Sequence, residues 1–348
     1  MRIAVIGAGA VGGLVAALAA RAGHEVLVTA RGEHAAAIAR AGLHIDGGWG
    51  EWVAAVEVVE SIPSAPLNGR GRERSAGPLD TPRTLDLLVL ATKAHDSASA
   101  LADWQARNGT PVLVLQNGLG GEAAVRDALP RSPVAIGLAL FAVSLTGSGR
   151  ITVTGPNGLT LGGDPAAVAV AEPLLREVLP AELVIADDIR GAQFTKLLIN
   201  QVNALPAITG LSVQQTVADD ALRGVLARGM VETVAVGDAA GVAWDRIGSV
   251  DADAVARVRA GGTTAASQLA QHLATGMGNV PNPASMLQSI QRGRTTEVDA
   301  INGAIVALGA QHGVPTPVSA ALVALVHEVE HSGLFLSPAH VAARIPPD

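Results

Sequence analysis

The chain has 348 residues, a formal net charge of −7 and no cysteine. At roughly 100–200 residues per domain, this length predicts two domains. Nucleic-acid binding needs clustered Lys and Arg against the phosphates, so the acidic balance argues against nucleic acid as a partner. Without cysteine, the chain can have no disulfide framework, no thiol nucleophile and no cysteine-based metal site.

The stretch 3–20 is uncharged, but four glycines interrupt it, which argues against a secretory signal peptide. Elsewhere no uncharged apolar run reaches the roughly 18 residues that a membrane span needs. We therefore expect a soluble, cytoplasmic protein that has no membrane partner.

The first elements form a strand–helix–strand unit. An apolar strand is expected at 3–6, followed by a glycine-rich turn, an alanine-rich helix to about Ala22 and a second strand at 25–29. Between the first strand and the helix, the G-x-G-x-x-G pattern of dinucleotide-binding proteins is present. The pattern gives these candidate cofactor-binding residues: Gly7, Gly9, Ala10, Val11 and Gly12.

Each glycine of this pattern has a physical role. The first permits the tight turn, the second lets a pyrophosphate approach the backbone, and the third lets helix and strand pack closely. The helix N-terminus adds N–H donors and a partial positive charge for the phosphates. The alternative is an ordinary glycine-rich turn, but its place inside a complete strand–helix–strand unit favours a nucleotide site.

The end of the second strand indicates which dinucleotide is bound. An acid there would bind the ribose 2′-hydroxyl of NAD, but this strand ends without one, at Arg31. Arginine can bind the 2′-phosphate of NADP with charge-assisted hydrogen bonds. We therefore predict NADP (NADPH) as the cofactor, unless Arg31 is merely an exposed loop residue.

Strands and helical stretches continue to alternate as far as about residue 188, as in α/β proteins. A segment rich in Pro, Gly and Arg, 61–83, interrupts this pattern and is predicted to be a flexible insertion. The further strands are expected at 53–59, 87–91, 112–116, 134–143, 151–154 and 159–162.

From about residue 188 the pattern becomes helical. Helical segments are expected at 190–204, 212–240, 251–275, 285–311 and 316–331. The predicted fold class is therefore α/β, with an N-terminal Rossmann-type dinucleotide-binding domain at 1–188 and a C-terminal all-α domain at 189–348.

Lys196, Asn200 and Asn203 are spaced so that they share one face of a helix. The residues between them are mostly apolar and would hold the helix in the core, where a lysine beside two asparagines is unusual. Lysine can donate a proton, and asparagine can bind carbonyl and hydroxyl groups. The alternative is a helix edge at which these side chains serve the surface and the backbone.

A second polar cluster covers 282–303. Ser285 could cap a helix, and Thr295, Thr296 and Glu297 could be ordinary helix-start residues. Further on, His327-Glu328-Val329-Glu330-His331 matches H-E-x-x-H, in which two histidines on one helix face bind zinc. A third protein ligand is not apparent in the short remainder of the chain, so we expect no metal.

Taken together, the motifs resemble the ketopantoate reductase (2-dehydropantoate 2-reductase) family. The resemblance spans nearly the whole chain, and the combined order of its motifs is specific, although each motif alone is not. In chain order the matching motifs are Gly7–Gly12, Lys93, Gln116-Asn117-Gly118, Lys196–Asn200, Ser285–Gly303 and the late turn His312–Pro317.

The resemblance implies roles for matching residues. Lys196 would be the general acid, and Lys93 and Asn117 would line the cofactor side. The expected substrate-binding residues are Asn200, Asn203, Ser285 and Glu297. Asn203 departs from the family pattern, which often has its second asparagine at the position of Ala204, and whether Asn203 replaces it stays open.

The expected reaction is the NADPH-dependent reduction of 2-dehydropantoate to pantoate, in which hydride is transferred to the carbonyl of a 2-keto acid. The nicotinamide is expected in a cleft between the two domains, beside the Lys196 helix. Three alternatives are weighed: a reductase of another branched 2-keto acid, a non-catalytic NADP(H)-binding protein and a zinc hydrolase. The partner is a small-molecule substrate, and a homodimer is left open.

Overall fold

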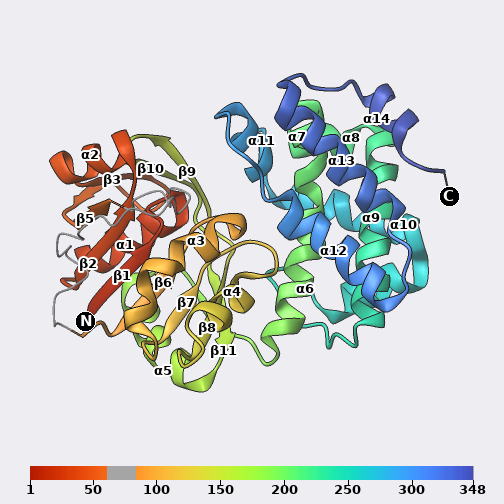
Figure 1. Cartoon of the computed structure of the whole chain (residues 1–348). Helices are drawn as coiled ribbons and strands as arrows, with labels where there is room; N and C mark the ends of the chain where they lie inside the picture. The colour runs from red at the N-terminus through yellow and green to blue at the C-terminus, as the bar shows by residue number, and fades with distance from the viewer. Residues whose placement is uncertain (61–83, 348) are drawn as a thin grey trace, which may run out of the picture. The chain divides into compact units, whose positions relative to one another are not determined.

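The computed structural model describes residues 1–60 and 84–347, and the chain folds into two compact units (Figure 1). We call Met1–Gln116 with Gly120–Ala186 the α/β unit, and Asn117–Leu119 with Asp187–Asp348 the helical unit. The expected insertion 61–83 lies outside the described residues. The segment 117–119, which we expected in the first domain, belongs instead to the helical unit.

The larger sheet of the α/β unit has eight strands in the order β12-β11-β8-β7-β6-β1-β2-β5. All neighbouring strands in this sheet are parallel, except for β8 and β11, which are antiparallel to each other. The strands are β1 Arg2–Ile6, β2 Glu25–Ala30, β5 Glu57–Glu60, β6 Leu87–Leu90, β7 Val112–Val114, β8 Val134–Ala139, β11 Leu159–Gly163 and β12 Leu183–Ile185.

A second sheet has four strands in the order β4-β3-β10-β9. Its strands are β3 Leu43–Gly47, β4 Trp52–Ala54, β9 Ala142–Gly147 and β10 Arg150–Gly155. Two expected strands were therefore wrong, because 53–59 divides into β4 and β5, and 134–143 into β8 and β9, with the parts in different sheets. The residues that join the two strands in each segment are apolar, so the hydrophobic periodicity could not reveal that the chain passes from one sheet to the other.

Helix α1, Ala10–Arg21, lies between the two sheets and contacts strands of both. All its residues from Gly12 to Ala19 are buried. A Cβ added at Gly13 would lie 2.5 Å from the Ile151 side chain of β10, so small residues are required here. This explains why the helix is rich in Ala and Gly rather than amphipathic.

The other helices of the unit are α2 Gly32–Ala41, α3 Ser97–Leu101, α4 Gly121–Ala128 and α5 Pro165–Val178, with 3-10 turns η2 Ala94–Asp96 and η3 Ala102–Arg107.

The helices of the helical unit are α6 Ile189–Asn200, η4 Gln201–Asn203, α7 Ala204–Thr209, α8 Val213–Ala218, α9 Asp220–Ala239, α10 Ala252–Gly276, α11 Ala284–Gln291, α12 Val298–His312, α13 Pro317–Ser332 and α14 Pro338–Arg344. Three of the predicted helical segments (190–204, 212–240 and 285–311) are divided into shorter helices, whereas 251–275 and 316–331 correspond closely to α10 and α13. The expected helix 190–204 is divided, because α6 ends at Asn200 and passes through the 3-10 turn η4 into α7, whose first turn contains Pro206. The expected helix 285–311 is interrupted near Gly293, which has a φ of +62°.

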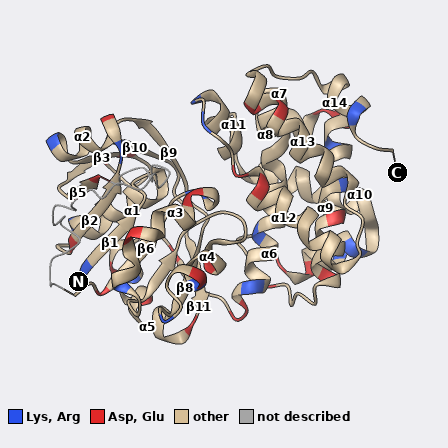
Figure 2. Cartoon of the chain, in the orientation of Figure 1, with Lys and Arg blue, Asp and Glu red and all other residues tan. Residues whose placement is uncertain are grey.

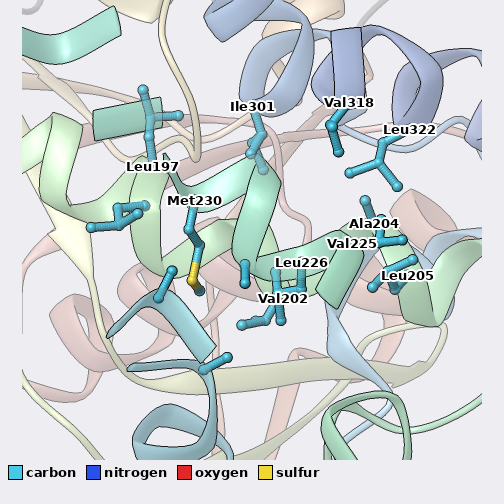
Figure 3. Packing of buried hydrophobic residues seen from close by; sticks show 14 of the residues in the cluster. Leu197, Val202, Ala204, Leu205, Val225, Leu226, Met230, Ile301, Val318 and Leu322 are labelled. Carbon is cyan, nitrogen blue, oxygen red and sulfur yellow. The ribbon is translucent and has the colours of Figure 1, made fainter. Parts of the chain in front are cut away.

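The core of the helical unit is aliphatic. Figure 3 shows Leu197 and Val202, which flank the polar stripe of α6 and η4, together with Met230 of α9 and Ile301 of α12. Because these side chains are buried, they fix the orientation of the Lys196 helix.

Figure 2 shows acidic and basic segments interspersed in both units, with no continuous basic stripe along the part of the chain that is drawn in colour. No helix within residues 1–60 and 84–347 has the length and apolar character to cross a membrane.

Candidate functional site

The glycine-rich turn joins β1 to α1 as a dinucleotide loop requires. Gly7 has a φ of +101°, and a Cβ there would lie 2.9 Å from the backbone nitrogen of Thr92. A Cβ at Gly12 would overlap the carbonyl oxygen of Gly7. At Gly9 an added Cβ would meet no described atom within 4 Å, so the helix N-terminus is open there to a ligand. Ala10 and Val11 form the first turn of α1, which has no acidic side chain among its described residues.

Two side chains that the sequence reasoning missed hold this loop. Thr29 Oγ1 accepts a hydrogen bond from the Gly7 backbone nitrogen at 2.8 Å. His34 Nδ1 accepts from the Gly149 backbone nitrogen at 3.0 Å, which leaves Nε2 to donate to the Ala8 carbonyl at 2.6 Å. His34 therefore ties the loop to the β9–β10 turn, a long-range contact that no local pattern could indicate.

Arg31 directly follows β2 and is the residue before α2, at the position where the sequence predicts the 2′-phosphate contact. Its side chain is 60% exposed and free to meet a ligand in solution, although Asp96 lies 3.7 Å from its guanidinium. Lys93 begins the η2 turn after β6, on the same side of the fold as Asp96. Because β6, β1 and β2 are adjacent and parallel, their carboxyl ends gather these residues at one edge of the sheet.

The segment after β7 divides between the units. Gln116 stays in the α/β unit, where Nε2 donates to the Thr92 carbonyl at 2.6 Å and to Ser97 Oγ at 2.8 Å. Asn117 belongs to the helical unit and donates from Nδ2 to Glu297 Oε2 at 3.3 Å. Gly118 is required because a Cβ there would overlap the carbonyl oxygen of Ala300. The structure thus joins an expected cofactor residue to an expected substrate residue.

Helix α6 begins with a side-chain cap, because Asp188 accepts a hydrogen bond from the Gly191 backbone nitrogen at 3.0 Å. Lys196 lies on this helix between buried Thr195 and Leu197. Burial lowers the pKa of Lys196 to about 8, since removing the ammonium group from water disfavours its charged form. A lysine with this pKa is a competent proton donor near neutral pH.

One turn after Lys196, buried amides surround the end of the helix. The Nδ2 atom of Asn200 is buried and has no hydrogen-bond partner among the described residues. Asn302, in the interior of α12, donates from Nδ2 to Gln201 Oε1 at 2.8 Å, while its own Oδ1 has no partner in the described chain. An unpaired buried amide is costly, so Asn200 is suited to donate to a bound oxygen. Asn203 is buried in η4.

Ser285 lies at the start of α11 with its side chain exposed. The expected alternative role as a helix cap is not observed, because Asn282 Oδ1 accepts from the Ala284 backbone nitrogen at 2.8 Å. Ala284 has a φ of +57° and is the one non-glycine with a left-handed backbone in the described part of the chain. Such strain persists where the surroundings fix the chain, and here it sets the position of Ser285.

Glu297 precedes α12, and its neighbour Thr296 performs the helix-start function, accepting from the Val298 backbone nitrogen at 3.2 Å. Glu330 Oε1 accepts from the Thr296 backbone nitrogen at 2.6 Å, so it anchors the turn that carries Glu297. Burial alone would raise the pKa of Glu330, but hydrogen bonds from Thr296 and His327 hold it below its usual range.

Residues of the H-E-x-x-H motif hold the turn before α12 in place: Glu330 binds the Thr296 backbone, and His327 contacts Glu330. His327 contacts Glu330 through Nδ1 and Asp299 through Nε2, each at 2.9 Å. The hydrogen bond with Glu330 is the main reason that the pKa of His327 is raised. No group of three metal-ligating side chains occurs within the ranges that the structure describes.

The elements that carry the expected substrate residues pack together within the helical unit. Helix α12 packs against α6, and α11 packs against η4 and α7. The structure thus brings the Lys196 amine, the unpaired amide of Asn200 and the Glu297 carboxylate onto neighbouring elements of the helical unit. These features of the helical unit, and the glycine-rich turn of the α/β unit, are each typical of a nucleotide-dependent oxidoreductase.

Comparisons with known proteins agree with this class. The family described as Ketopantoate reductase PanE/ApbA matches residues 3–165, and Ketopantoate reductase PanE/ApbA C terminal matches residues 188–330. The chain belongs to the ketopantoate reductase family. It is an oxidoreductase with the α/β Rossmann-type and all-α architecture that the sequence predicts.

Two relatives named 2-dehydropantoate 2-reductase cover almost the whole chain. The protein of Halobacterium salinarum is 28% identical, covering 96% of this chain and 100% of its own length. The protein of Mesorhizobium japonicum is 29% identical, covering 94% of this chain and 98% of its own length.

Two solved structures are also similar. A PanE/ApbA family ketopantoate reductase from Ralstonia eutropha has a TM-score of 0.77 and 27% identity, covering 95% of this chain and 99% of that one. D-mandelate dehydrogenase with NADH and anilino(oxo)acetate has a TM-score of 0.76 and 25% identity, covering 95% of this chain and 99% of that one.

Proposed function

We propose that the protein catalyses the NADPH-dependent reduction of 2-dehydropantoate to pantoate. The observation that carries this proposal is Lys196, whose pKa of about 8 suits a proton donor, one turn from the unpaired amide of Asn200. Relatives named for this reaction over almost the full chain length support the same conclusion.

The α/β unit is proposed to hold the nucleotide. The open backbone around Gly9 and the N–H groups at the start of α1 fit the pyrophosphate, since both donors and dipole favour an anion there. Arg31 fits a 2′-phosphate, and Lys93, which precedes the η2 turn after β6, is proposed to line the cofactor side. When bound, the reduced nicotinamide supplies the hydride that adds to the keto carbon.

The helical unit is proposed to hold the keto acid. Lys196 donates its proton to the keto oxygen as negative charge develops there, which yields the 2-hydroxy acid and a neutral amine. Asn200 donates its free Nδ2 hydrogens to substrate oxygen, and Asn203 and Ser285 add hydrogen bonds to the carboxylate or hydroxyl groups. Glu297 accepts a hydrogen bond from the substrate's 4-hydroxyl.

A second candidate is the reduction of a 2-keto acid that lacks the 4-hydroxyl. The similarity to D-mandelate dehydrogenase, which was solved with anilino(oxo)acetate, favours this possibility. NADPH oxidation measured against 2-keto acids with and without a 4-hydroxyl separates the two candidates. If no 2-keto acid is reduced, the proposed reaction is incorrect.

Replacing Arg31 with alanine should weaken NADPH binding roughly 10- to 150-fold, because a hydrogen bond to a charged group contributes about 1.5–3 kcal/mol. NADH, which has no 2′-phosphate, should be affected much less. Direct titration of both nucleotides into wild type and the variant measures this difference. Equal losses for both would show that Arg31 does not contact the 2′-phosphate.

A further inference from the structure

An acidic side chain stands beside the predicted 2′-phosphate position. Asp96 Oδ2 lies 3.7 Å from Arg31 Nη2 and 3.7 Å from His95 Nε2. Asp96 ends the η2 turn after β6, whereas Arg31 directly follows β2, and β1 lies between these two strands in the sheet. The two side chains therefore meet at the same edge of the sheet as the glycine loop, which follows β1.

The position of Asp96 is set by its backbone. Its amide nitrogen donates to the Lys93 carbonyl at 2.9 Å, which closes the η2 turn. The same carbonyl accepts from Ser97 Oγ at 3.4 Å. The carboxylate is 40% exposed, so a ligand that reaches Arg31 can also reach Asp96.

The chemistry of a carboxylate at this point discriminates between nucleotides. An ionised carboxylate accepts hydrogen bonds and has none to donate, so it suits a free ribose 2′-hydroxyl. A 2′-phosphate bound by Arg31 would bring a second negative group within a few ångströms of Asp96, and like charges at that range repel. The absence of an acid at the end of β2 is thus compensated by an acid from the neighbouring loop.

We propose that Asp96 is a cofactor-specificity residue, which opposes the 2′-phosphate that Arg31 attracts and accepts a hydrogen bond from a free 2′-hydroxyl. The inference rests on the proposed function, since it assumes a nicotinamide dinucleotide on the glycine loop. Its consequence is that the protein binds both NADPH and NADH, with NADPH favoured by a narrower margin than Arg31 alone would give.

The test is the Asp96→Asn variant, titrated with NADPH and with NADH in the absence of any keto acid. The ratio of the two dissociation constants should shift toward NADPH by roughly 10-fold, which corresponds to about 1.4 kcal/mol. Most of the shift should come from tighter NADPH binding, and it should shrink as salt screens the charges. Asp103→Asn is the matched control, because it removes one exposed acid from the neighbouring η3 turn and should leave the ratio unchanged.

The outcomes separate this inference from the proposed function. An unchanged ratio in Asp96→Asn, or weaker NADPH binding, would overturn the specificity role and mark Asp96 as a support for Arg31. An equal shift in Asp103→Asn would show that the loss of any nearby negative charge is enough, and this would also overturn the specificity role of Asp96. If the wild-type protein binds neither nucleotide, the proposed function fails and this inference fails with it.

Discussion

Replacing Lys196 with alanine is expected to lower kcat by at least about 10²-fold, because general acid catalysis contributes roughly 10²–10⁴-fold. Hydride addition builds negative charge on the keto oxygen, and the proton donor must lie within hydrogen-bond reach of it. The sequence contains no Cys or Tyr, and Lys93 and Lys196 are its only lysines. NADPH affinity should stay near the wild-type value, because Lys196 belongs to the helical unit and not to the glycine loop.

The pKa of Lys196 adds a pH dependence. The acid must be protonated to act, so wild-type kcat should fall as the pH rises through about 8, the pKa that burial sets. Lys196→Arg is the matched control, since it keeps the positive charge but does not titrate in this range. It should lose the alkaline limb without recovering the wild-type rate.

Pre-steady-state measurement of hydride transfer separates the chemical step from product release. A near wild-type rate for this step in folded Lys196→Ala would rule out Lys196 as the acid. Lys93 would then become the next candidate.

Local sequence patterns predicted the fold correctly wherever a structural feature depends only on residues that are close together in the sequence. The glycine spacing, the apolar strand before it and the alanine-rich helix after it predicted the nucleotide-binding architecture correctly, because each feature depends on neighbouring residues. The sequence pattern could not show that 53–59 and 134–143 each contain two strands that belong to different sheets. There the choice of sheet depends on long-range pairing, such as that of β9 with β10.

The candidate site shows the same distinction. The Lys196–Asn200 spacing predicted a polar helical stripe, but the partner of Asn117 and the contact between Asn302 and Gln201 join residues far apart in the sequence. The histidine motif at 327–331 has the spacing of a zinc site, but the sequence offered no third ligand and we expected no metal there. The structure instead gives His327 and Glu330 the task of anchoring the turn before α12.

The specificity of Asp96 could not be predicted for a related reason. The expected acid for ribose recognition is the residue that ends the second strand, and that residue here is Arg31. Only the pairing of β1 with both β2 and β6 brings a residue from the later loop to the same edge.

Replacing Glu297 with alanine is expected to lower kcat/KM for 2-dehydropantoate by at least about 10²-fold, whereas 2-keto acids that lack the 4-hydroxyl should be affected little. Sites built to hydrogen-bond a hydroxyl discriminate by as much as roughly 10⁴-fold, because their own polar group is left unpaired without it. Glu297 is half-buried and its carboxylate accepts from Asn117 at 3.3 Å, so the protein already fixes one side of the acceptor.

The measurement is kcat/KM for paired substrates that differ only in the 4-hydroxyl, in wild type and Glu297→Ala. Glu328→Ala is the matched control, because Glu328 is an acid of α13 whose contact is an ion pair with Arg344. It should leave both values near wild type. The role of Glu297 requires that only the substrate with a 4-hydroxyl loses kcat/KM. An equal loss on both substrates would mean that Glu297 stabilises the fold or positions Lys196, and does not bind the substrate hydroxyl.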